Sequence, residues 1–96
     1  MKGNTINEFI GDLLSMGGPE KEFIFRSKKY FLETTFNNKE NIKELVIFEC
    51  CDKANPYIYK SQGKTLKDLV NQFEKANIFD GMNIYEAENE IEVIFG

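Results

Sequence analysis

Hydrophobic positions near the start of the chain recur at helical spacing. The apolar side chains fall at i, i+3, i+4, i+7 and i+8, which places them on one stripe of a helix. This stripe consists of Ile6, Phe9, Ile10, Leu13 and Leu14. Thr5 and Glu8 have the spacing of a capping box at its start, and Gly17 followed by Pro19 is typical of a helix end.

Residues 21–60 change to the composition and spacing of β-strands. The segments "KEFIFRS", "KYFLETTF", "KELVIFECC" and "YIYK" are rich in aromatic and β-branched residues. Only "SKK" separates the first two, which predicts a tight hairpin with Lys28 and Lys29 near its tip. Because the connections are short, a four-stranded antiparallel meander is the simplest arrangement.

A second helical stripe follows, formed by Leu66, Leu69, Val70 and Phe73. Thr65 with Asp68 three residues later predicts its N-terminal cap, and the helix is expected to end near Asn77. Asp80–Gly81 is a turn dipeptide that leads into the last segment.

The last segment, "NIYEAENEIEVIFG", fits two structures. In a strand, Glu86, Glu88, Glu90 and Glu92 would share one face, because side chains alternate with a period of two. In a helix, apolar residues from Ile84 onward would form the stripe. A cap at Asn83 with an acid three residues later, and the low strand propensity of Glu and Ala, favour a helix over residues 83–91, with "VIFG" extended.

These elements predict a single domain over residues 1–96, of the α+β class. Its order would be α-β-β-β-β-α-α, in two layers, with an N-terminal helix and two C-terminal helices packed on one face of the meander.

Charge and cysteine usage limit the kinds of binding partner and the cellular compartment that we expect. Five of the 16 acidic residues lie in residues 80–96, which contain no Lys or Arg, so the acidic excess is confined to that segment. Without a basic footprint, direct nucleic-acid binding is disfavoured. Cys50 and Cys51 are adjacent, where an ordinary disulfide would be strained, and with no signal peptide in the sequence this predicts a reduced, cytoplasmic protein. No apolar run approaches the length of a membrane span, so none is expected.

No catalytic, cofactor-binding or metal-binding residue is predicted. The chain has no His, which removes the usual general base and the commonest zinc ligand. The alternating glutamates lack the spacing of a calcium loop, and "SQGK" lacks the glycine spacing of a phosphate loop. We therefore expect a protein that is not an enzyme and holds no cofactor.

The sequence instead offers candidate partner-binding residues of two kinds: the glutamates 86, 88, 90 and 92 as an acidic surface, and Tyr57 and Tyr59 as part of an exposed aromatic sheet face. The predicted sheet is aromatic on both faces, whereas helices can cover only one. An open aromatic face would suit a protein partner or self-association into a homodimer.

Two stretches carry a resemblance: "KEFIFRSKKYFLE" and "SQGKTLKDLVNQFEKANIFDGMNIYEAENEIEVIF". Together they resemble a family of small uncharacterised proteins of low-GC Gram-positive bacteria and their mobile elements. The family's usual proline after "EKA" is Asn77 here, which leaves the end of the second helix less sharply defined. The resemblance implies a single domain and brings no activity with it.

The function expected from the sequence is a small cytosolic, non-enzymatic protein-binding module, with no direct contact to nucleic acid or membrane. The alternative is an inhibitor encoded by a mobile element, whose acidic C-terminal surface mimics nucleic acid.

Overall fold

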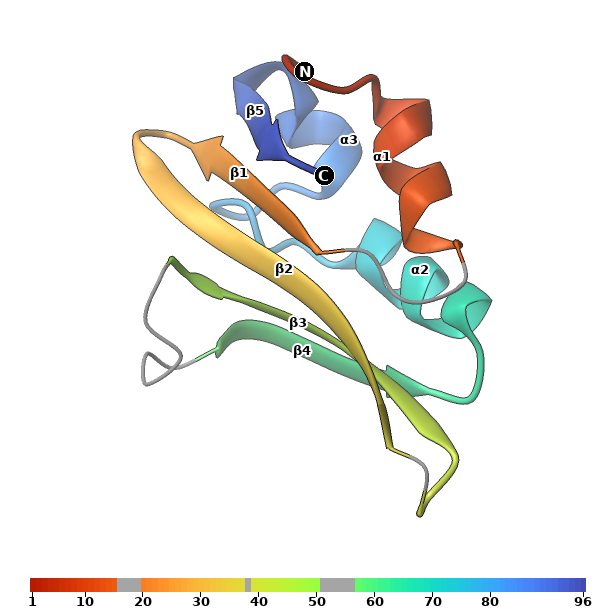
Figure 1. The fold of residues 1–96 in the computed structure, drawn as a ribbon. Helices are drawn as coiled ribbons and strands as arrows, with labels where there is room; N and C mark the ends of the chain where they lie inside the picture. The colour runs from red at the N-terminus through yellow and green to blue at the C-terminus, as the bar shows by residue number, and fades with distance from the viewer. Residues whose placement is uncertain (16–19, 38, 51–56) are drawn as a thin grey trace.

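The computed structural model describes residues 1–15, 20–37, 39–50 and 57–96, and Figure 1 shows their arrangement. The described residues form an α+β fold, as the sequence predicts. The helices are α1 (Ile6–Leu13), α2 (Leu66–Lys75), α3 (Ile84–Ala87) and the 3₁₀ turn η1 (Glu88–Glu90). The strands are β1 (Lys21–Phe25), β2 (Lys28–Asn37), β3 (Ile42–Glu49), β4 (Tyr57–Gly63) and β5 (Ile91–Phe95).

The strands form one antiparallel sheet in the order β4-β3-β2-β1-β5. The meander of β1 to β4 is confirmed, but the sheet has a fifth strand that the sequence analysis did not predict. The tip of the first hairpin is Arg26–Ser27, two residues before the predicted position, and Lys28 and Lys29 already belong to β2. Both tip residues have positive φ, which matches the twist of a two-residue hairpin turn.

The prediction of a helix over residues 83–91 is wrong beyond its first turn. The cap at Asn83 with Glu86 is present, and α3 begins there. The helix then gives way to η1 and β5, because Ile91 and Val93 pair with Phe25 and Phe23 of β1 and extend the buried face of the sheet. Burying two large side chains against β1 outweighs the helix propensity of the intervening Glu residues.

The helices lie together on one face of the sheet, as Figure 1 shows, and the core lies between the two layers. The N-terminal caps of α1 and α2 form at Thr5 and Thr65, as predicted. α2 ends at Lys75, two residues before the predicted Asn77. The predicted stop of the first helix at Gly17 and Pro19 lies outside the described residues.

One edge of the sheet is covered by the start of the chain. The main-chain N–H of Lys2 donates to the Ile91 carbonyl (3.0 Å), and the Val93 N–H donates to the Lys2 carbonyl (2.8 Å). Gly3 follows with φ of 81°, and a Cβ there would lie 2.0 Å from the Val93 carbonyl oxygen, so only glycine fits this approach. The opposite edge of the sheet is β4.

Candidate partner-binding surface

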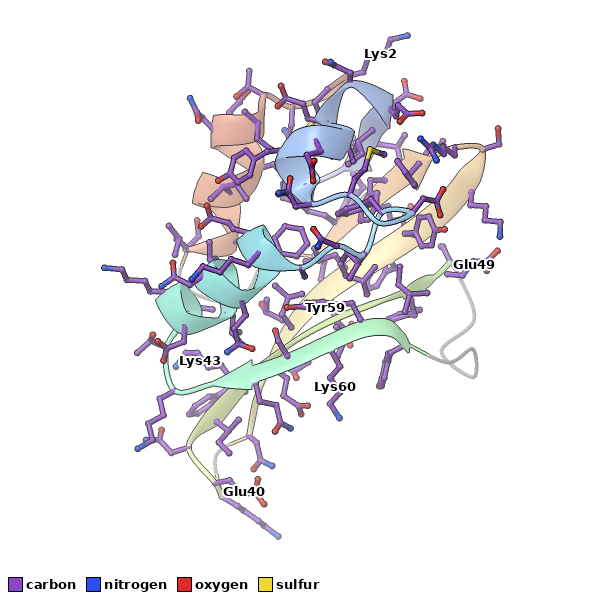
Figure 2. All side chains as sticks on the ribbon, turned by 180° about the vertical axis from the view of Figure 1, so that it is seen from behind. Lys2, Glu40, Lys43, Glu49, Tyr59 and Lys60 are labelled. Carbon is purple, nitrogen blue, oxygen red and sulfur yellow. The ribbon has the colours of Figure 1, made fainter. Side chains whose placement is uncertain are left out.

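The two candidate tyrosines lie on opposite faces of the sheet. The pairing of β3 with β4 shifts between Ile47 and Phe48, so that Ile47 pairs with Tyr59 whereas Phe48 pairs with Tyr57. Figure 2 shows Tyr59 on the side that faces the helices, where its ring lies 6.2 Å from that of Phe73. Tyr57 is 53% exposed. The expectation that both belong to one exposed aromatic face is therefore wrong for Tyr59.

The face of the sheet without helices carries a short aromatic row across three strands. Phe31 on β2, Phe48 on β3 and Tyr57 on β4 lie side by side, with ring centroids 5.3 Å and 6.1 Å apart. Phe48 is buried, Phe31 is half-buried and Tyr57 is exposed. The row thus becomes more accessible toward β4, where Ile58 is also 42% exposed.

Charged side chains border this row in pairs of opposite sign. Lys29 lies 3.4 Å from Glu22, and Lys60 lies 3.1 Å from Glu44. The Gln62 amide also donates to Glu44 (3.0 Å), and this hydrogen bond, followed by that of Lys60, lowers the pKa of the Glu44 carboxyl. The Lys60 ammonium also lies over the Tyr57 ring. These contacts hold the polar side chains beside the exposed aromatic residue.

The four candidate glutamates do not form a common surface. Glu86 accepts the main-chain N–H of Asn83 in the capping box, and Glu90 at the end of η1 binds Arg26. Glu92 lies on β5 opposite Ile24, on the face of the sheet away from the helices. Glu88, in η1, is half-buried. Only a strand over the whole segment would have kept the four carboxylates on one face, and the change from helix to strand separates them.

Arg26 is a charged residue that the sequence analysis did not single out. Its guanidinium donates to both carboxylate oxygens of Glu90 (2.9 Å each) and to Asp80 (2.8 Å). Asp80 also has positive φ, and with Gly81 it forms the predicted turn, closed by Phe79 and Met82. The guanidinium fork suits this two-carboxylate arrangement. We name Arg26, Asp80 and Glu90 the arginine clamp.

The arginine clamp predicts a measurable shift in one carboxyl pKa. The hydrogen bonds from Arg26 hold the pKa of Glu90 below its ordinary value, so in an Arg26→Ala variant this pKa is expected to rise toward that ordinary value. Since the folded-state value is the lower one, the clamp stabilises the fold above the unfolded-state pKa, and this contribution disappears as the pH falls through the folded-state pKa. Carboxyl ¹³C NMR titration measures the value. The control is Lys28→Ala, and an unshifted Glu90 in the unmodified protein would contradict the clamp.

The described residues bear on metal binding, membrane crossing and the state of one cysteine. They contain no group of three or more His, Cys, Asp or Glu side chains able to hold a metal ion. In the same part of the chain, no helix has the length and apolar character needed to cross a membrane. Cys50 is disulfide-bonded, which does not agree with the predicted reduced thiols, and Cys51 lies outside the described residues.

No protein-family model matches the chain, and no curated protein or solved structure shows significant similarity to it. The resemblance to small proteins of low-GC Gram-positive bacteria therefore stays a prediction.

Proposed function

We propose that the protein is a small protein-binding module, without enzymatic activity, whose partner packs against the β4 side of the helix-free sheet face. The observation that carries this proposal is the aromatic row that ends in Tyr57. A half-exposed tyrosine beside an exposed isoleucine presents a large apolar area with a polar tip. Tyrosine is enriched among the anchors of protein interfaces. The same face could join two copies of the chain.

The surroundings of Tyr57 also support an interface. Phe48, the middle member of the row, is nearly fully buried beside Tyr57, so the exposed ring packs against a fixed neighbour. The paired charges of Lys60 and Glu44 form a polar border next to the apolar centre. An apolar centre with a polar rim is the usual composition of a protein–protein contact. The proposed cytoplasmic setting rests on the sequence alone.

Site-specific photo-crosslinking tests the proposal in the source cell. A benzoylphenylalanine at position 57 is expected to form adducts with a partner, or with a second copy if the protein self-associates. Position 85 is the matched control, since Tyr85 is 46% exposed but lies on α3, on the helix side of the molecule. A Tyr57→Ala variant should bind the captured partner about tenfold more weakly or worse. Equal adducts at positions 57 and 85 would argue against this surface.

The nucleic-acid mimic is the second proposal, and the same experiment separates it from the first. It would place the contact on the acidic C-terminal segment, so adducts would form at position 88 and not at position 57. Its support is the acidic excess of residues 80–96. Its weakness is that Arg26 already forms ion pairs with Asp80 and Glu90, and that Glu92 lies on β5 whereas Glu88 lies in η1.

A further inference from the structure

The outer edge of β4 presents main-chain groups that a further strand could use. The Gln62 carbonyl accepts a hydrogen bond from the Gln72 side chain of α2 (2.9 Å). We infer from this contact that the carbonyl points away from β3. In an antiparallel pair, every second residue has its N–H and C=O directed away from the neighbouring strand. The N–H and C=O of Lys60 therefore point outward as well. β4 is the end strand of the sheet in the described part of the chain.

The chain around this edge is basic. Residues 57–68 contain three lysines, Lys60, Lys64 and Lys67, and one acid, Asp68, which lies beside Gly63 at the end of β4. Lys60 forms an ion pair with Glu44 of β3, whereas no ion pair of Lys64 or Lys67 is present within the described residues. All three lysines are exposed. This local charge contrasts with the net charge of −4 for the whole chain, so an acidic segment would find its electrostatic match here.

The same charges disfavour a second copy at this edge. Two β4 strands related by a two-fold axis would bring Lys60 and Lys64 of one copy close to those of the other. Like charges opposite one another across a strand pair are destabilising. The occupant that fits is therefore a different chain, extended and acidic.

We propose that β4 binds an extended acidic segment of a partner protein, which adds to the sheet as a further antiparallel or parallel strand. This inference rests on the proposed protein-binding function and specifies the partner. The segment would alternate, with carboxylates beside Lys60 on the helix-free face and small apolar side chains beside Ser61 on the helix side. Main-chain hydrogen bonds to Lys60 would provide the affinity common to all such segments, and the carboxylates would provide the selectivity.

Gln72 gives the proposal a distinctive prediction. Its side-chain amide donates a hydrogen bond to the Gln62 carbonyl, which is an acceptor that an added strand would otherwise use. Removing it frees that carbonyl, so a Gln72→Ala variant is expected to bind the segment about fivefold more tightly, the effect of one net hydrogen bond. Asn71→Ala, at the neighbouring exposed position of α2, is the control and should leave the affinity unchanged.

The probe is an acetylated and amidated seven-residue peptide of alternating valine and glutamate. It should bind, and a valine–lysine peptide should bind at least about tenfold more weakly. Two further versions carry N-methyl groups either on every valine or on every glutamate nitrogen. Only one set of peptide N–H groups can face β4, so one version should lose binding and the other should keep it.

Amide hydrogen exchange of the full chain supplies the structural readout. The outward N–H of Lys60 should exchange rapidly in the free protein and become protected in the complex. Peptide binding without protection of Lys60, equal loss with both methylated versions, or no binding would overturn the proposal. If photo-crosslinking at position 57 captures a partner while the peptide fails, the protein-binding function stands and the strand addition is excluded.

Discussion

An Asp12→Ala variant is expected to lose about 3 kcal/mol of its free energy of unfolding, roughly a fifth to three-fifths of the stability of a typical small domain. Asp12 on α1 is the charged partner of Lys21, the first residue of β1, and the Lys21 side chain is fully buried. Removing the carboxylate would leave a buried ammonium without its counter-ion. Urea unfolding monitored by circular dichroism measures the loss.

The surroundings of Lys21 explain why the effect should be large. Its Nζ donates to Asp12 Oδ2 (2.8 Å), Asn4 Oδ1 (3.1 Å) and the Gly96 main-chain oxygen (3.0 Å), so all three of its donors are satisfied. It also lies 5.1 Å from the centre of the Phe9 ring. One amine thus joins α1, β1 and both ends of the described chain.

The two members of the pair should respond differently. Lys21→Met removes the buried charge itself and keeps most of the volume, and the carboxylate left behind is 46% exposed and can be hydrated. We therefore expect a cost of about 1 kcal/mol, much below that of Asp12→Ala. Asn7→Ala, at an exposed position of the same helix, is the control and should change stability by less than about 0.5 kcal/mol. An Asp12→Ala cost no larger than that of the control would contradict the role of this pair.

The elements that could be predicted from the sequence are those set by local chemistry. The caps at Thr5, Thr65 and Asn83 depend on residues three positions apart, and all three form. The meander of β1 to β4 depends on short connections, which restrict each strand to pairing with its neighbour. The Asp80–Gly81 turn depends on two adjacent residues that tolerate positive φ.

The features that could not be predicted depend on contacts between distant parts of the chain. β5 forms because β1 offers an open edge and a buried face. β1 lies far earlier in the chain, at Lys21–Phe25, so the sequence near residue 91 contains no sign of this edge. The alternation of Ile91 and Val93 was the available signal, but a helical stripe fitted the segment as well. Arg26 and Glu90 are 64 residues apart in the sequence. Counting charges segment by segment therefore left the acidic C-terminal residues without a basic partner.

The same limitation affected the candidate site. A period of two placed Tyr57 and Tyr59 on one face, and the register shift beside Phe48 separated them. A β-bulge adds one residue to one strand, which reverses the direction of every side chain beyond it. No local sequence pattern marks this shift, so the exposed aromatic row became visible only from the pairing of β3 with β4.

A Phe73→Ala variant is expected to lose about 4 kcal/mol of the free energy of unfolding, since a fully buried aromatic side chain is replaced by a cavity. Phe73 on α2 is 0% exposed, and its ring centroid lies 6.2 Å from Phe9, 6.2 Å from Tyr59 and 6.3 Å from Phe79. These partners belong to α1, to β4 and to the segment between α2 and α3. One truncation therefore weakens the contact of several elements at once.

Phe36→Ala is the matched control for this substitution. Phe36 near the end of β2 is 50% exposed and contacts the ammonium of Lys43, so its truncation should cost under about 1 kcal/mol. Phe73 also fixes α2 over β4, and the preceding residue of the helix, Gln72, reaches the β4 edge from there. If Phe73→Ala cost no more than Phe36→Ala, α2 would not be anchored through this ring, and the position of Gln72 at the edge would need another support.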